Sequence, residues 1–398
     1  MLKTAIQAGV LSLCLAGALV APAAAQAPAE GPPANPLWRE AKVRNYLPHM
    51  TWPEVADLLM RTDLVIIPVA AIEEHGPQGP VGTDFLNGLE AAKLVAQKTD
   101  ALVAPILLPG NSPYHMAFPG TISLKAETIQ AVYFEAAQSL IHHGFRRFIF
   151  LNAHGGNAAT TRFIVDRINQ ETPAIAVEMT EAAAPYMRRQ PTPGLPPGQF
   201  DRHAGFGETS SSLYLTPGLV DMKAVRVAPI TLPPHLKAML PRVAAGDRTA
   251  SLVFLAEALK AEDTGKRTST REMTETGIWS EADVSKANAA AGKLSSDALI
   301  DATVQFIDDW KRLRPLQPLA ERSPGAAAAE LKEALLDGAP RGVAAKRPSR
   351  RGITNVLVLF FSSPSVCALV SPGAQTKGVM KHGANAAGTA PSRPGSRR

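Results

Sequence analysis

The chain has 398 residues, 45% of them hydrophobic, and a formal net charge of +6. Twelve Lys and Arg but four Asp and Glu lie from Pro315 onward, so the excess positive charge is concentrated at the C-terminal end. The remaining residues are close to neutral and give no basic footprint for nucleic acid, while the length suits one large α/β domain with appendages.

Residues 1–25 have the three parts of a secretory signal peptide. Lys3 precedes an apolar run from Val10 to Val20, and small residues stand just before Gln26. The run is too short to favour a helix that stays in the membrane, although a retained anchor is the alternative. We predict an exported protein, periplasmic or extracellular, with no stable membrane insertion after leader removal. Cys367 would then be the sole cysteine, which excludes an intrachain disulfide.

Residues 26–37 are rich in Ala, Pro and Gly and are predicted to be a flexible leader to a domain over residues 38–314. Thr51 and Glu54 have the spacing of a capping box and predict a helix that begins at Trp52. The apolar run from Leu64 to Ala70 then predicts the first buried strand.

The loop after this strand concentrates carboxylate and imidazole groups among Gly and Pro. Glu73 and His75 stand two residues apart, and Asp84 precedes apolar residues at helical spacing. Asp84 is therefore predicted at a helix N-terminus, where the dipole favours its ionised form. Such ligands suit a divalent metal, although a solvated Glu-His pair and a simple N-cap are the plainer readings. Glu74 could serve as an auxiliary base, but we expect it to face outward, because neighbours in a strand point to opposite faces.

Strands and helices continue to alternate along the chain. Further strands are predicted at 101–108, 148–151 and 174–179, and helices at 127–143, 158–169 and 282–313. This alternation predicts a three-layer αβα sandwich with a mainly parallel sheet. Sites in such sheets form beyond the carboxyl ends of the strands, where Glu73, His75 and His154 fall.

Two further motifs supply polar groups at element ends. Asn152-Ala153-His154-Gly155-Gly156-Asn157 follows the strand at 148–151, and Asn157 is expected to cap the next helix. Asp201-Arg202-His203-Ala204-Gly205-Phe206-Gly207-Glu208 opens a later helix. His-Gly-Gly alone is often just a turn, so the prediction depends on the three motifs occurring together.

Taken together, the three motifs resemble the creatininase family of metal-dependent amidohydrolases in order, spacing and most residue types. The resemblance covers about residues 38–313 and includes Phe118-Pro119-Gly120-Thr121. It implies a dinuclear centre in which Asp84 bridges the two metals. Glu73 and His154 would complete one metal site, and His75 and Glu208 the other.

The resemblance also implies a mechanism. Two divalent ions per subunit, expected to be zinc with manganese or iron as alternatives, would activate a hydroxide that attacks an amide carbonyl. His203 would donate a proton to the leaving nitrogen. Gly155 and Gly156 would let the backbone approach the substrate, and His115 would either contact the substrate or pack its loop. Family members form rings of subunits, so a homo-oligomer, such as a hexamer, is implied.

Departures from the family pattern bear on the substrate. Gly156 stands where creatinine-cleaving members carry glutamate, Gln78 where many members have histidine, and Glu74 where many have glutamine. The predicted function is hydrolysis of the C–N bond of a small cyclic or non-peptide amide resembling creatinine. The alternatives are a formamide or short-peptide hydrolase of the same family, and an exported metal- or solute-binding protein without turnover.

Residues 315–398 differ in composition from the domain. Arg341 to Arg351 is a basic run, and the apolar run from Ile353 to Val370 is interrupted by Pro364 and several serines, which makes it a poor spanning helix. We predict a low-complexity basic tail that is disordered.

Overall fold

The computed structural model describes residues 35, 40–188, 194–196, 198–258 and 270–322. Contacts divide the chain into residues 1–339 and 340–398, and the described residues all belong to the first unit. The predicted signal peptide and the tail from residue 323 lie outside the described residues, as does most of the predicted leader. Every helix in the described part of the chain is too short or too polar to span a bilayer.

The elements follow the chain as an alternation of strands and helices that ends in helices. The strands are β1 (Leu64–Val69), β2 (Leu102–Val103), β3 (Arg147–Asn152), β4 (Ile175–Glu178), β5 (Asp201–His203) and β6 (Trp279–Ser280). The helices are α1 (Trp52–Leu59), α2 (Thr83–Thr99), α3 (Ala126–His142), α4 (Ala158–Glu171), α5 (Met179–Ala183), α6 (Phe206–Leu215), α7 (Pro234–Lys237), α8 (Leu240–Ala244), α9 (Arg248–Ala258), α10 (Thr270–Met273), α11 (Ala289–Leu313) and α12 (Leu319–Arg322).

The central sheet has four strands in the order β2-β1-β3-β4, and all of them are parallel. Val65 on β1 pairs with Leu102 on β2 and with Phe148 on β3. All six residues of β1 are buried, as expected of a strand covered on both faces. The prediction of a mainly parallel sheet is confirmed.

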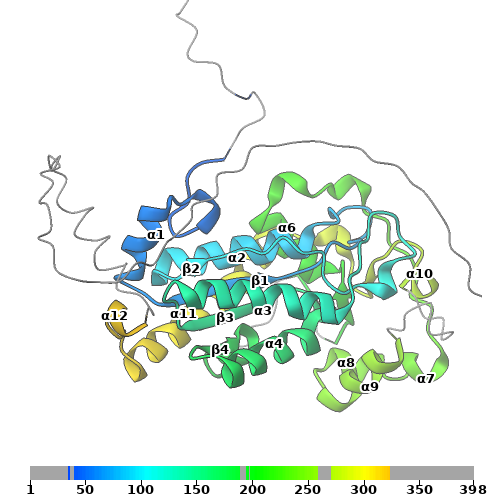
Figure 1. Cartoon of the computed structure of the whole chain (residues 1–398). Helices are drawn as coiled ribbons and strands as arrows, with labels where there is room; N and C mark the ends of the chain where they lie inside the picture. The colour runs from blue at the N-terminus through cyan, green and yellow to red at the C-terminus, as the bar shows by residue number, and fades with distance from the viewer. Residues whose placement is uncertain (1–34, 36–39, 189–193, 197, 259–269, 323–398) are drawn as a thin grey trace, which may run out of the picture. The chain divides into compact units, whose positions relative to one another are not determined.

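Helices cover both faces of this sheet (Figure 1). Val65 and Ile67 of β1 pack in one core cluster with residues of α1, α3 and α4. Leu64 and Ile66 point to the other face and pack with residues of α2 and α11. Because strand side chains alternate, a continuous apolar strand supplies both cores. The predicted three-layer αβα arrangement is thereby confirmed.

Two predicted elements are shorter than expected. β2 pairs only over Leu102–Val103, although the apolar run extends to residue 108. Pro105 and Pro109 lack the N–H that a ladder needs, and the chain leaves the sheet there. α11 begins at Ala289 rather than at residue 282, because the Asn288 side chain accepts a hydrogen bond from the N–H of Ala291 and caps the helix.

A second, smaller core lies beside the sheet domain. It contains the ring cluster of Phe200, Phe254 and Trp279, whose centroids lie 5.3–5.4 Å apart. α7, α8 and α9 contribute to this cluster, and Figure 1 shows these helices grouped together. The antiparallel pair β5–β6 joins this core to the segment that carries His203.

The packed domain extends past the predicted boundary at residue 314. Leu319 of α12 is buried in the first core cluster. The Arg322 guanidinium is buried and donates hydrogen bonds to the carbonyls of Gly144 and Leu59, at 2.7 Å each. Residues 315–322 therefore belong to the domain, because a buried apolar side chain and a buried, hydrogen-bonded cation fix them there.

We expect α12 to contribute measurably to stability. A chain ending at Arg314 should have a free energy of unfolding about 2–5 kcal/mol below that of a chain ending at Arg322. The shorter chain loses the burial of Leu319, and the carbonyls of Gly144 and Leu59 lose their hydrogen-bond donor. Denaturant unfolding of the two truncated chains measures the difference. Equal unfolding free energies would show that α12 only rests on the surface.

Candidate metal centre

The candidate centre lies where the order of the sheet strands reverses. From β1 the chain moves outward to β2 and then crosses back to β3 on the other side of β1. Crevices at such switch points, beyond the carboxyl ends of the strands, are the usual ligand sites of open parallel sheets. Glu73 and His75 follow β1, and His154 follows β3, so their side chains meet at this point.

Two carboxylates enter the site from the first turns of helices. Asp84 is the second residue of α2, and Glu208 is the third residue of α6. Free backbone N–H groups and the helix dipole stabilise negative charge there. Glu208 also accepts a hydrogen bond from the N–H of Ala204 at 2.7 Å. The predicted position of Asp84 at a helix N-terminus is confirmed.

The Asp84 carboxylate lies between two histidines. Its Oδ1 is 3.3 Å from His75 Nε2, and its Oδ2 is 3.2 Å from His154 Nδ1. Asp84 itself is 4% exposed, so solvent does not screen these contacts. One carboxylate thus serves two imidazoles on opposite sides, the arrangement expected of a bridging ligand.

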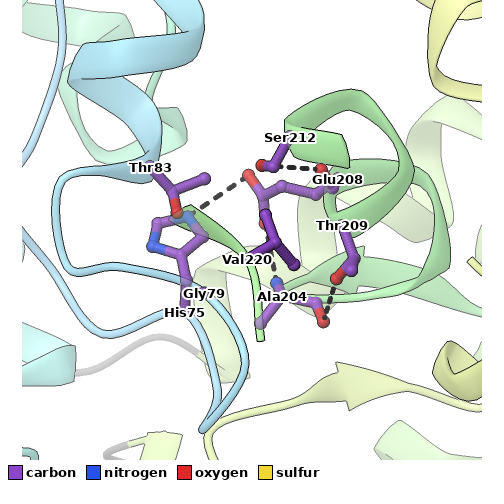
Figure 2. A pocket seen from close by; sticks show the side chains of 8 residues that line it. All are labelled: His75, Gly79, Thr83, Ala204, Glu208, Thr209, Ser212 and Val220. Carbon is purple, nitrogen blue, oxygen red and sulfur yellow. Dashed lines mark hydrogen bonds and ion pairs between the residues drawn. The ribbon is translucent and has the colours of Figure 1, made fainter. Parts of the chain in front are cut away.

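One further carboxylate completes each half of the centre. Glu73 Oε1 is 3.1 Å from His154 Nδ1, and Glu208 Oε1 is 3.4 Å from His75 Nε2. Figure 2 shows the second pair, with Glu208 from α6 and the His75 ring pointing toward one another. Three groups of possible ligand atoms lie within 4.8 Å of one another: those of Glu73, Asp84 and His154, those of His75, His203 and Glu208, and those of Glu73, His115 and His203.

The unpaired atoms of the site fit a metal ion. Glu73 Oε2, His75 Nε2 and Asp84 Oδ2 are buried, yet none of them has a hydrogen bond of good geometry. Buried polar atoms without partners are costly. Oxygen and imidazole donors in this arrangement are those that zinc, manganese and iron accept.

Backbone carbonyls orient the two histidines that are candidate ligands. His75 Nδ1 is 3.1 Å from the carbonyl of Glu73, and His154 Nε2 is 3.0 Å from the carbonyl of Asn111. A carbonyl can only accept, so these two nitrogens carry the protons. The opposite nitrogens, which face the carboxylates, are then left free to bind a metal.

His203 and His115 stack over the centre, and Glu74 links them. Their ring centroids are 4.1 Å apart, and Glu74 Oε1 is 3.1 Å from both His203 Nε2 and His115 Nδ1. Glu74 is 5% exposed, so the prediction that it faces outward is wrong. β1 ends at Val69, and the strand alternation on which that prediction depended does not reach Glu74.

Mutual interactions set the charge states of these groups. Burial opposes ionisation, but the charge of His75 lowers the pKa of both Asp84 and Glu208 to about 2. Burial likewise opposes protonation of His154, yet the charge of Glu73 raises its pKa to about 10. The metal-free centre therefore holds His75 and His154 protonated against ionised carboxylates at neutral pH.

The glycines of the second motif have different surroundings. A Cβ on Gly156 would lie 2.3 Å from both the Asn111 carbonyl and the Tyr114 hydroxyl, whereas a Cβ on Gly155 would meet no atom within 4 Å. Gly156 thus permits close packing around His154, and only Gly155 borders open space. Asn157 does not cap α4 through its side chain, which instead bonds the Asn111 N–H and the Ala70 carbonyl at 3.0 and 2.9 Å.

Sequence reasoning missed the residues that surround the histidines. Tyr114 OH and Ser112 Oγ lie 3.2 and 3.3 Å from His154 Nε2, and Thr270 Oγ1 lies 2.8 Å from His115 Nδ1. His115 is 3% exposed and lies within the centre, so loop packing alone does not describe it. The only early signal for Tyr114 and Ser112 was their place beside His115 in the loop before Phe118.

Comparison with known proteins identifies the family. A family model described as Creatininase, creatinine amidohydrolase, matches residues 48–307. The match covers more than half of the chain and contains all three motifs, together with the predicted ligands and His203.

Three characterised relatives differ in how much they share. A 3-dehydro-scyllo-inosose hydrolase of Thermotoga maritima is 37% identical over 111 residues, which are 28% of this chain and 36% of that protein. A creatinine amidohydrolase of Pseudomonas putida is 30% identical over 209 residues, 48% of this chain and 79% of that protein. A mycofactocin precursor peptide peptidase of Mycobacterium tuberculosis is 27% identical over 256 residues, 62% and 85% of the two chains. The chain thus spans little more than a third of the inosose hydrolase but most of the other two.

Solved creatininases are also similar to this chain. A structure named Creatininase Mn is 21% identical with a TM-score of 0.46, and a mutant creatininase of Zn-Zn type is 22% identical with a TM-score of 0.47. Each comparison covers 68% of this chain and 99% of the other. These identities are too low to carry ligand roles over to this chain, so the assignment of ligands depends on the contacts within this chain.

Substitution of the shared carboxylate tests the centre directly. Asp84→Asn keeps the side-chain shape but removes the charge that faces both His75 and His154, so metal affinity should fall at least about 100-fold. Elemental analysis after dialysis against a metal buffer measures the loss. His142→Ala, at the exposed end of α3, is the matched control and should keep its metal. An Asp84→Asn protein with full metal content would remove Asp84 from the ligand set.

Metal binding should release protons near neutral pH. His154 has its pKa raised to about 10 and is protonated there, so a metal ion must displace that proton, whereas Asp84 and Glu208 are already ionised. Affinity should consequently rise as the pH rises. Titration calorimetry of zinc into metal-free protein, in buffers of different ionisation enthalpy, counts the protons. Identical heats in all buffers would contradict this protonation state.

Proposed function

We propose that this chain, which belongs to the creatininase family, is a metal-dependent hydrolase that cleaves the C–N bond of a small amide. The observation that carries the proposal is the buried Asp84 carboxylate, which lies within 3.3 Å of a histidine on each side. A structural ion pair needs one partner, whereas a shared carboxylate with two ligand sets suits two ions. Zinc, manganese and iron all accept this mixture of donors.

Divalent ions bound by these ligands would supply Lewis acidity, which polarises an amide carbonyl and lowers the pKa of water toward neutrality. Residues of this chain set the charge of the centre and orient its imidazoles. Glu73, Asp84 and Glu208 fix the charge of the centre, and the carbonyls of Glu73 and Asn111 hold the ligand imidazoles in orientation.

His203 is the proton donor in this proposal. Its Nε2–H donates to the carbonyl of Glu74 at 2.7 Å, so Nδ1 faces the interior, 3.6 Å from Glu73 Oε1 and 4.0 Å from Glu208 Oε2. Burial lowers the pKa of His203, but the charge of Glu74 raises it above its usual value. The imidazolium can then give its Nδ1 proton to the leaving nitrogen of the amide.

The surroundings of Gly156 favour a substrate other than creatinine itself. Creatinine-cleaving members carry a glutamate at this place, but here the Asn111 carbonyl and the Tyr114 hydroxyl occupy the space that its side chain would need. A formamide or a short peptide is therefore the second candidate substrate. The relative named a mycofactocin precursor peptide peptidase matches this chain over most of its own length, which supports this alternative.

Two further properties stay proposals. We infer export from the signal-peptide pattern of residues 1–25, and a homo-oligomer from the habit of the family. N-terminal sequencing of the exported protein tests the removal of the signal peptide. Size-exclusion chromatography with light scattering on the mature chain measures the oligomeric state.

A substrate panel tests the reaction. The metal-loaded protein should hydrolyse at least one member among creatinine, N-formyl compounds and dipeptides, and the reaction should stop when a chelator removes the metal. Mass spectrometry gives the rates, as the ring-opened product of creatinine and as the amine released from an N-formyl compound or a dipeptide. Retained metal without hydrolysis of any member would instead favour a binding protein that has the fold but no turnover.

Replacement of His203 separates proton transfer from metal binding. His203→Ala should lower kcat by about 10²–10⁴ while the bound metal stays the same, because a general acid is lost but Asp84 keeps both ligand sets. His143→Ala, exposed after α3, is the control. Unchanged kcat in the His203→Ala protein would rule out the assigned role.

A further inference from the structure

A cavity next to the centre contains cationic side chains that the proposed reaction leaves unused. Its volume is about 390 Å³, and Glu74 and His75 form part of its wall. A volume of this size is typical of sites for small ligands. The remaining wall includes Val81, Phe118, Pro119, Arg226, Arg271 and Glu275.

Both arginines have donors to spare. Arg226 Nη1 donates to the carbonyls of Lys223 and Val225 at 3.1 and 2.9 Å, and Arg271 Nη1 donates to the carbonyl of Ala117 at 3.3 Å. Among the described residues, no carboxylate lies within ion-pair distance of either guanidinium. A guanidinium has five N–H donors, so most donors of both arginines remain available to a ligand.

The electrostatic balance of the cavity favours an anion. Glu74 is already shared between His115 and His203, which leaves Glu275 as the other acidic group on the wall. Two guanidiniums therefore face the cavity against one free carboxylate. Phe118 lies under Arg271, with the guanidinium carbon 5.5 Å from the ring centroid, and this contact holds the cation beside the apolar wall.

We propose that the substrate is an amide that also carries a carboxylate, and that Arg226 and Arg271 bind this carboxylate while the amide lies at the metal centre. The planar fork of a guanidinium matches a carboxylate in two parallel hydrogen bonds. Val81, Phe118 and Pro119 would pack against the hydrocarbon part. N-acyl amino acids and peptides with a free C-terminus belong to this class. The proposal rests on the proposed amide hydrolysis.

A matched substrate pair tests this specificity. N-acetylphenylalanine and N-acetylphenethylamine differ only by the carboxylate. The metal-loaded full chain should hydrolyse the first with a kcat/KM about tenfold to a hundredfold above that of the second, the range expected of charge-assisted hydrogen bonds. Equal values for the two compounds would overturn the proposal.

Variants identify the arginines as the cause. In the double variant Arg226→Gln, Arg271→Gln, the preference for N-acetylphenylalanine should disappear through a higher KM, while kinetics with N-acetylphenethylamine stay within about twofold. Arg248→Gln is the matched control, because Arg248 is exposed on α9 and does not line the cavity. A preference that survives in the double variant would overturn the proposal.

A binding measurement keeps the test independent of catalysis. Calorimetry with 3-phenylpropanoate and 3-phenylpropan-1-ol needs no hydrolysable bond. The metal-loaded wild type and Arg248→Gln should bind 3-phenylpropanoate at least about tenfold more tightly than the double variant does. All three proteins should bind 3-phenylpropan-1-ol equally. If no amide is hydrolysed but this binding difference appears, the proposed function fails and the carboxylate site stands. Equal carboxylate binding in all three proteins overturns the site.

Discussion

The buried negative charge of Asp84 is the constraint on which the rest of the centre depends, because burying a charge without partners is costly. An ionised carboxylate that is 4% exposed needs compensation on every side, and His75, His154 and the first turn of α2 supply it. Each of these partners is in turn held by a second contact, such as the carbonyl of Asn111 on His154. The centre is therefore a connected network in which loss of one charge leaves several buried groups without partners.

The sheet topology explains why such distant segments meet. β1 and β3 are neighbours with parallel directions, so the residues that follow them emerge at the same edge, where α2 and α6 also begin. Gly156 and Asn157 then allow the loops to pack closely against one another. Gly156 lets the Asn111 segment approach His154, and Asn157 ties Asn111 to the end of β1 through Ala70. Packing of the backbone and chemistry of the centre are thus coupled.

Local sequence signals predicted the sheet, most helices and the segments that carry the ligands, because each is encoded within a few neighbouring residues. Contacts between distant segments were beyond such signals. Tyr114 meets His154 across 40 residues, and no periodic pattern marks that contact. The orientation of Glu74 and the side-chain role of Asn157 were predicted wrongly, since both lie at element ends where the partners come from other loops. Three motifs in order carried more information than any one residue.

We propose that two metal ions share the carboxylate of one residue, Asp84. Anomalous diffraction from crystals of the full chain grown with manganese tests it most directly. A shared carboxylate should give two peaks about 3.5–4 Å apart, one beside His154 and Glu73 and the other beside His75 and Glu208, with an Asp84 oxygen bound to each. A single peak, or peaks that do not contact Asp84, would show that this carboxylate does not bridge two ions.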